Sequence, residues 1–305
     1  MASFSFELKP AAPFRLDLTV WALRRRPENL IDRWDGETYS RILLIQGAPL
    51  EIRVHSTGSV DSPVLHALVQ GSRLSRRSEP EVRRTVITLL GAQLDLSPFY
   101  FLADRDRRLK RIVDQFRGMK PPCFPTVFEA LINAVACQQL TLTVGIQLLN
   151  RLSALCGKEG TSGMHAFPAP DKVLQISLDQ MRALGFSFAK ARAISEVACA
   201  ANAGELEFGR LSQLSDEELR ERLMALKGIG RWSAEYAMLR GLGRLSIFPS
   251  DDAGARNKLE ALFGSGARMS YSEVGRRVAR WRPFAGLVYF HLLLSGLTER
   301  GLIRT

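Results

Sequence analysis

The stretch Leu226-Lys-Gly-Ile-Gly-Arg-Trp-Ser-Ala234 sets two glycines around one aliphatic residue, between two segments with helical periodicity. A glycine carries no Cβ, so the backbone of Gly228 and Gly230 can come close to a ligand. The N–H groups that follow Gly230 then point outward at the start of a helix, where a phosphate group binds well. The same pattern is also typical of a tight helical corner that uses its glycines as caps. On these residues alone, a DNA-binding hairpin and a simple corner both remain open.

The stretch Phe248-Pro-Ser-Asp-Asp-Ala-Gly254 places two carboxylates at the start of another predicted helix. Aspartates in this position commonly cap a helix, because their side chains accept hydrogen bonds from the free N–H groups of the first turn. A carboxylate held beside a sugar can also stabilise the positive charge that appears when a glycosidic bond breaks. Capping and catalysis are therefore the alternatives for Asp251 and Asp252.

Together these stretches resemble the helix-hairpin-helix (HhH-GPD) DNA glycosylase superfamily, and most closely its bacterial 3-methyladenine DNA glycosylase II branch. The helix pair between Phe128 and Leu152, with Cys137-Gln-Gln-Leu-Thr141 at its joint, fits the same branch. The resemblance is strong over residues 126–260 and weak before residue 100. It implies a mainly α fold with an N-terminal α+β domain, in which two helical subdomains flank a cleft.

The resemblance implies roles for residues around that cleft. The register Asp-Ala-Gly-Ala selects Asp252 as the catalytic carboxylate, which leaves Asp251 as the helix cap or a supporting carboxylate. Leu140 is expected to be the wedge that fills the gap when a base leaves the duplex, with ordinary packing as the alternative for Leu140 and for Tyr236. The substrate pocket is expected from Trp232, Tyr236, Gln139 and Phe186, with Phe188 as a weaker candidate, and the DNA contacts from Gly228, Ile229, Gly230, Arg231, Leu140 and Thr141.

Trp232 stands two residues after the second hairpin glycine, where members of the superfamily that also cut the DNA strand carry a lysine. Because that lysine is the nucleophile that forms a Schiff base, the resemblance implies a monofunctional enzyme. Such a glycosylase flips out alkylated bases in base-excision repair, hydrolyses the N-glycosidic bond and leaves an abasic site. The alternatives are an oxidised-guanine glycosylase and a non-catalytic DNA-damage-binding protein. The preferred lesion stays open, because the last helix lacks the tryptophan often found in this branch and reads Phe290-His-Leu-Leu-Leu294.

The composition favours a polyanionic partner. The 305 residues include 42 Lys and Arg against 31 Asp and Glu, which gives a net charge of +11. This excess suits double-stranded DNA, although most of the basic residues are Arg, and a genome rich in G and C would also raise the Arg content. Apolar residues at 46% and charged residues at 24% are typical of a globular protein, and they exclude a disordered tail or a low-complexity scaffold.

No cofactor is expected, since the cysteines lie far apart in the sequence. Their spacing argues against a zinc site, an iron–sulfur cluster and a disulfide framework; they are Cys123, Cys137, Cys156 and Cys199. Hairpin carbonyls hold a monovalent cation in some members of this superfamily, so the resemblance implies a structural Na⁺ or K⁺ site at Leu226 and Gly228.

The start of the chain shows no secretory pattern, and the apolar stretch Phe284–Leu297 is too short to span a bilayer. We expect a cytoplasmic monomer that associates with the nucleoid through DNA binding, and no membrane partner.

The first hundred residues read as a small α+β unit. They predict a strand at Phe14–Val20, a hairpin formed by Arg41–Gln46 and Leu50–Val54, and a helix from Glu79 to Gly91. From residue 97 onward the pattern is helical, and the last helix is expected over Tyr271–Gly296. We therefore expect an antiparallel-sheet domain at residues 1–96 and an all-helical catalytic region at 97–305, with helical subdomains at about 126–240 and at 97–125 plus 241–305.

Overall fold

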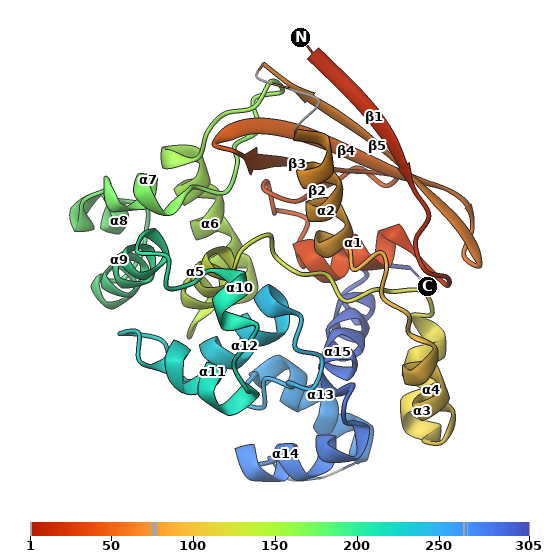
Figure 1. The fold of residues 1–305 in the computed structure, drawn as a ribbon. Helices are drawn as coiled ribbons and strands as arrows, with labels where there is room; N and C mark the ends of the chain where they lie inside the picture. The colour runs from red at the N-terminus through yellow and green to blue at the C-terminus, as the bar shows by residue number, and fades with distance from the viewer. Residues whose placement is uncertain (1, 73, 75–77, 265, 267, 305) are drawn as a thin grey trace.

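An antiparallel sheet occupies one side of the computed structural model, which describes residues 2–304 except 73, 75–77, 265 and 267 (Figure 1). Its strand order is β1-β5-β4-β3-β2. The expected hairpin is confirmed, since Ile45 pairs with Ala48 and the two residues between them, Gln46 and Gly47, have φ of 50° and 74°. Positive φ at both central residues gives a primed turn, whose twist matches the strands that it joins. The strands are β1 (Ala2–Leu8), β2 (Arg33–Trp34), β3 (Thr38–Ile45), β4 (Ala48–Ser59) and β5 (Ser62–Gly71).

The predicted strand at Phe14–Val20 is wrong, because most of these residues belong to the helix α1 (Leu16–Arg24). Leu16, Leu18 and Val20 alternate with polar residues as in a half-buried strand, but α1 is also buried at Thr19 and along its second half. When an element is covered on nearly all sides, its apolar residues no longer mark one face. The alternation then does not distinguish a strand from a helix.

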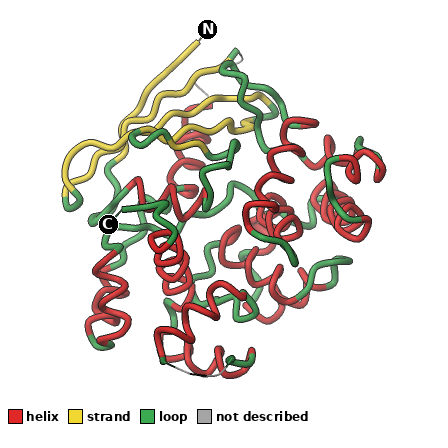
Figure 2. Tube along the Cα trace, turned by 180° about the vertical axis from the view of Figure 1, so that it is seen from behind, coloured by secondary structure: helices red, strands yellow, loops and turns green. Residues whose placement is uncertain are grey.

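Helices make up most of the remaining described structure, and most of them gather on the side of the molecule away from the sheet (Figure 2). The single helix expected over Tyr271–Gly296 is divided in two, because Pro283 lacks the N–H that a continuous helix needs at that position. The helices are α2 (Glu79–Leu89), α3 (Ser97–Asp104), α4 (Arg107–Gln115), α5 (Val127–Cys137), α6 (Leu142–Cys156), α7 (Pro170–Leu174), α8 (Leu178–Ala183), α9 (Phe188–Asn202), α10 (Phe208–Leu211), α11 (Asp216–Met224), α12 (Arg231–Leu242), α13 (Ala253–Phe263), α14 (Tyr271–Val278), the 3₁₀ turn η2 (Ala279–Trp281) and α15 (Ala285–Glu299).

Two large hydrophobic cores hold most of these elements together, and Ile42, Met164 and Ala166 form a smaller cluster among the described residues. The first joins the sheet to α1, α2, α5, α6, α9, α11 and much of α12, and the second joins α1, α3, α4, α13, α14 and α15. Residues 1–96 contribute to both cores, through the sheet and Leu16, Val20 and Leu23 of α1 to the first, and through Leu18 and Ala22 of α1 to the second. The domain limits drawn from the sequence stay a prediction.

None of the described helices combines the length and the apolar composition that crossing a bilayer requires.

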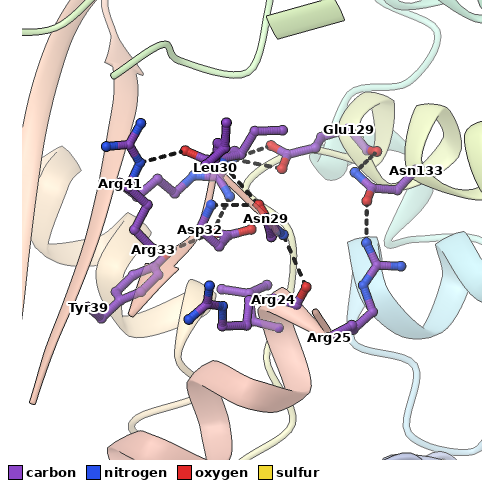
Figure 3. Close-up of polar contacts among 12 residues, drawn as sticks. Arg24, Arg25, Asn29, Leu30, Asp32, Arg33, Tyr39, Arg41, Glu129 and Asn133 are labelled. Carbon is purple, nitrogen blue, oxygen red and sulfur yellow. Dashed lines mark hydrogen bonds and ion pairs between the residues drawn. The ribbon is translucent and has the colours of Figure 1, made fainter. Parts of the chain in front are cut away.

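A buried ion-pair network fastens the sheet to α5 (Figure 3). Arg41 of β3 is fully buried and donates through Nη1 to Asp32 Oδ1 at 2.7 Å, and through Nη2 to the Glu129 carboxylate of α5 at 2.6 and 2.7 Å. Tyr39 also donates to Asp32, at 2.7 Å. Charged partners compensate a buried cation for its lost hydration, and removing one of them leaves that charge unpaired. Arg41 therefore requires the sheet and α5 to stay in this relative position.

Replacing Glu129 by alanine removes one of the two carboxylates that compensate the charge of Arg41. We expect the free energy of unfolding to fall by about 3 kcal/mol, which is typical of a broken buried ion pair, as measured by urea denaturation. The control is Asp104→Ala, which removes a partner of the exposed Lys110. No measurable change is expected there, because water screens the pair. Equal losses in the two variants would contradict the anchoring role of Arg41.

Candidate active site

An open cavity of about 1200 Å³ lies between the two cores and is lined by residues of both. Its walls come from the joint between α5 and α6, the start of α9, the turn before α12, the loop before α13, and α15. Arg25 and Arg26, which directly follow α1, also line it. The cleft between two helical groups that the sequence predicts is therefore present.

Asp252 lies in this cavity, half-buried, at the start of α13. Its Oδ1 accepts a hydrogen bond from the Ala255 N–H at 2.8 Å. Its Oδ2 accepts two more, from Trp232 Nε1 at 3.2 Å and from the Tyr289 hydroxyl at 3.1 Å. Three donors from α12, α13 and α15 thus hold one carboxylate in a single orientation, with part of it open to the cavity.

Asp251 does not cap the helix, which corrects the first of the two roles that the sequence suggests for it. The cap is Asp252, since its backbone is extended directly before the first helical residue and its side chain bonds the Ala255 N–H. Asp251 is exposed and lines the cavity. The choice between neighbouring aspartates depends on where the helix begins, and that boundary is set by the loop before it.

Trp232 and Tyr236 stand one turn apart on α12 and both line the cavity. Their ring centroids lie 5.5 Å apart with an angle of 36° between the planes. Tyr236 is almost fully buried, and its hydroxyl accepts a hydrogen bond from Arg25 Nη1 at 2.7 Å. Burial raises the pKa of Tyr236, so its hydroxyl keeps its proton at neutral pH. The two rings lie side by side in the cavity wall, and Tyr236 also packs in the first core, which was its alternative role; their role in holding a base stays a prediction.

The hairpin between α11 and α12 has the conformation that its glycines permit. Gly228 has φ of +87°, and a Cβ added there would lie 2.5 Å from the Ala193 side chain, so only glycine fits. Gly230 is the residue before α12 and lines the cavity together with Gly228 and Arg231. Ile229 differs, because it is buried and packs in the first core. Its contribution to the hairpin is therefore structural.

Both hairpin carbonyls that the resemblance assigns to a monovalent cation already accept one hydrogen bond. The Leu226 carbonyl accepts from the Ile229 N–H at 3.0 Å, and the Gly228 carbonyl from Gln138 Nε2 at 3.1 Å. A carbonyl oxygen has a second lone pair, so a Na⁺ or K⁺ ion fits these donors only through that remaining site. Cation binding here stays a prediction.

The joint between α5 and α6 lines the cavity. Gln139 has a left-handed backbone with φ of +53°, which turns the chain sharply, and Leu140 beyond it is 42% exposed. The Thr141 side chain caps α6. The joint is held from behind, because Lys190 of α9 donates to the carbonyl of Gln138 at 2.7 Å. An apolar side chain on such a supported turn has the placement expected of a wedge.

Phe186 does not line the cavity, although the sequence suggested it for the pocket. It is buried in the first core. Phe188 at the start of α9 is exposed and lies under the Arg192 guanidinium, 4.3 Å from it, and it does not line the cavity either. The residues between and after them, Ser187 and Ala189, do. In the turn before a helix, sequence spacing does not show which side chains face the cavity and which face the core or the solvent.

Two supporting residues are missed by sequence reasoning. Tyr289 directly precedes the segment Phe290–Leu294, in which the sequence lacks the expected tryptophan. It lies 37 positions after Asp252, to which its hydroxyl donates. Glu235 of α12 is buried, and its carboxylate accepts hydrogen bonds from the Tyr271 hydroxyl at 2.7 Å and the Ser250 N–H at 3.3 Å. It therefore ties α12 to the loop that leads to Asp252. Burial raises the pKa of the Glu235 carboxyl.

Comparison with known proteins supports the same fold. Residues 132–283 match the model of the HhH-GPD superfamily of base excision DNA repair proteins. DNA-3-methyladenine glycosylase 1 of Schizosaccharomyces pombe is 33% identical over 178 residues, which are 58% of this chain and 74% of that protein. A 3-methyladenine DNA glycosylase structure from Archaeoglobus fulgidus is similar over 95% of this chain and 97% of its own, with a TM-score of 0.81 and 26% identity. A Schizosaccharomyces pombe 3-methyladenine DNA glycosylase in complex with abasic DNA is similar over 67% and 98%, with a TM-score of 0.58 and 28% identity.

The capping geometry predicts different stabilities for variants of the two aspartates. Asp252→Ala leaves the Ala255 N–H without its partner, and we expect it to lower the free energy of unfolding by about 1 kcal/mol. Asp252→Asn keeps a capping oxygen and is expected to cost less. Asp251→Ala is expected to cost nothing measurable, because Asp251 is exposed. Thermal or urea unfolding of the three variants tests this, and a larger loss for Asp251→Ala than for Asp252→Ala would contradict the assignment.

Proposed function

Since the chain belongs to the HhH-GPD superfamily of base excision DNA repair proteins, we propose that it is a monofunctional DNA glycosylase. Its substrates are alkylated bases of the 3-methyladenine type in double-stranded DNA, and its product is an abasic site. The observation that carries the proposal is the Asp252 carboxylate, held by Trp232 and Tyr289 beside an aromatic wall, in a cavity whose mouth carries the hairpin.

The cavity suits an extrahelical base. A glycosylase cannot reach the glycosidic bond inside a duplex, so the nucleotide must rotate out into a pocket. Leu140 stands at the mouth, where it can occupy the space that the base leaves. The half-buried ring of Trp232 lines the cavity and suits stacking with a planar base, and Tyr236 packs beside it.

Hydrogen-bond donors and positive charges for the DNA phosphates lie around the same cavity. The hairpin presents the free N–H groups at the start of α12, which favour a phosphate group. Arg26, Arg231 and Arg300 line the cavity and add positive charge. The overall charge of +11 supplies the non-specific part of the affinity, which weakens steeply with salt.

The chemical step needs one carboxylate. When the bond between C1′ and the base nitrogen breaks, its electron pair leaves with the base and positive charge develops on the sugar. At about 4 Å and an effective dielectric constant of about 20, the Asp252 charge stabilises that sugar by about 4 kcal/mol, which is roughly a thousandfold in rate. Water then adds to C1′, and its proton passes to Asp252 or to solvent. An alkylated purine is already cationic and leaves as a neutral molecule, so no strong general acid is required.

Replacing Asp252 by asparagine should slow base release by about a thousandfold and preserve DNA binding, because the cap and the fold are kept. The assay uses duplexes that carry N3-methyladenine, N7-methylguanine, ethenoadenine, hypoxanthine or oxidised guanine, followed by heating in alkali. Asp251→Asn serves as the matched control and should keep its activity. A wild-type protein that binds every duplex and releases no base would indicate a non-catalytic damage binder instead.

The proposal that the enzyme does not cut the DNA strand is tested separately. Trp232 occupies the position of the Schiff-base lysine, and its Nε1 is engaged by Asp252, so no amine is available there. We expect strand breaks only after alkali, and no covalent complex with DNA when borohydride is present. Borohydride-dependent trapping would overturn the monofunctional assignment and favour a lyase of the oxidised-guanine type.

A further inference from the structure

Three arginines from different elements gather around one aromatic ring near α14, at the end of the molecule away from the sheet (Figure 1). Their guanidinium carbons lie 5.6, 4.8 and 5.3 Å from the centroid of the Phe263 ring, and they belong to Arg108 of α4, Arg277 of α14 and Arg280 of η2. Phe263 is the last residue of α13, and its ring stacks on the buried Trp281 with 5.7 Å between the centroids. We call Arg108, Arg277 and Arg280 the arginine cluster.

The positive charge of the arginine cluster is not neutralised by ion pairs. All three side chains are exposed, and within the described part of the chain none of them is ion-paired. Two carboxylates lie nearby, and both are engaged at helix starts. Asp106 caps α4 and accepts from Trp281 Nε1 at 3.1 Å, and Glu273 accepts from the Ser270 N–H at 2.7 Å at the start of α14. The cluster therefore suits a ligand that brings negative charge of its own.

Helix α14 connects the arginine cluster with the hairpin that the proposed function places on DNA. Its first residue, Tyr271, lies under the Arg231 guanidinium of the hairpin, 4.8 Å from it, and donates to Glu235 of α12. Arg277 stands in its last turn, and Arg280 follows in η2. Eight helical residues span about 12 Å. The cluster is therefore an extension of the hairpin surface along one helix.

Helix α13 sets the distance between the arginine cluster and the catalytic carboxylate. Asp252 directly precedes this helix of 11 residues, and Phe263 ends it. At a rise of about 1.5 Å per residue, the two residues lie about 16 Å apart. Phosphates of one DNA strand follow one another about every 3.4 Å along the duplex axis, so this distance corresponds to about five nucleotides. A duplex whose damaged base is at Asp252 is long enough to reach the cluster.

We propose that the arginine cluster is a second phosphate-binding surface, which holds the duplex on one side of the damaged base, about five nucleotides away from it. This inference rests on the proposed glycosylase function. A guanidinium presents a planar fork of donors that matches the oxygens of a phosphate, and it can lie against an aromatic ring at the same time. Because phosphates are the same in every sequence, the surface adds affinity without adding a sequence preference.

The test measures binding to duplexes that differ in the length of each flank. The probe carries a tetrahydrofuran abasic analogue at a fixed position, which locates the enzyme and has no base to release. One duplex extends well beyond about five base pairs on both sides of the analogue, and two others are cut short of that length on one side or the other. The double variant Arg277→Gln/Arg280→Gln should bind the long duplex about tenfold more weakly. Its slope of log affinity against log salt should fall by about 2, because two phosphate contacts are lost. On the duplex that lacks the contacted flank, the variant should bind as tightly as the wild type.

Two comparisons separate phosphate contacts from net charge and from folding. The matched control is Arg83→Gln/Arg117→Gln, which removes the same charge. Both of these arginines also lie over an aromatic ring, but each is paired with a carboxylate, and neither lines the cavity. We expect its affinity and salt slope to stay close to those of the wild type. The variant Arg277→Lys/Arg280→Lys keeps the charge and should keep the salt slope. Base release at saturating enzyme should be unchanged in all of them.

The outcomes distinguish the arginine cluster from the proposed function. Unchanged binding of the double glutamine variant to the long duplex would overturn the role of the cluster. So would equal losses on long and shortened duplexes, or an equally large loss in the matched control. A wild-type protein that binds the abasic duplex and releases no base would overturn the proposed function, whereas the dependence on the flank would still decide the cluster. A wild-type protein that binds no duplex would overturn both.

Discussion

The burial of Arg41 between Asp32 and Glu129 is the constraint on which the placement of the other elements depends. Moving the sheet that carries Arg41 away from the helix that carries Glu129 would leave buried charges unpaired, so the two elements stay together. Helix α5 packs in turn against α12 in the first core. The sheet, which contributes no residue to the cavity, thereby sets the position of the helix that carries Trp232 and Tyr236.

The same polar contacts continue from Glu129 to the cavity. Asn133 donates to the Glu129 carbonyl one turn before it and accepts from Arg25 (Figure 3). Arg25 also donates to the Tyr236 hydroxyl. The two buried arginines at the ends of this chain of contacts differ in one respect. Arg41 is paired with two carboxylates, whereas Arg25 donates its hydrogen bonds to neutral groups, Asn133 and the Tyr236 hydroxyl. The distinction lies in the partners, because the residue type is the same.

Much of the site could be predicted where the chemistry is local in sequence. The glycines of the hairpin are needed for a positive φ and for a close approach to Ala193, and a short motif reveals such needs. Trp232 and Tyr236 share a helix face because they are four positions apart. The failures have a common cause. The residues of α1 alternate as in a strand because the helix is buried on nearly all sides. Phe186 lies on a turn whose direction the sequence spacing does not show, and its side chain packs in the core. Helix α13 begins one residue later than expected, so Asp252 caps it and Asp251 does not.

The sequence by itself determined the hairpin, the carboxylate at the start of α13 and the aromatic pair of α12, since each depends on backbone rules within a few residues. Only the tertiary structure decided which groups surround that carboxylate. Tyr289 reaches Asp252 from 37 positions away, and Arg25 reaches Tyr236 across 211. Contacts at such separations are set by how whole helices pack in two cores. A local pattern carries no information on that packing, and so the electrostatic character of the pocket emerged only from the fold.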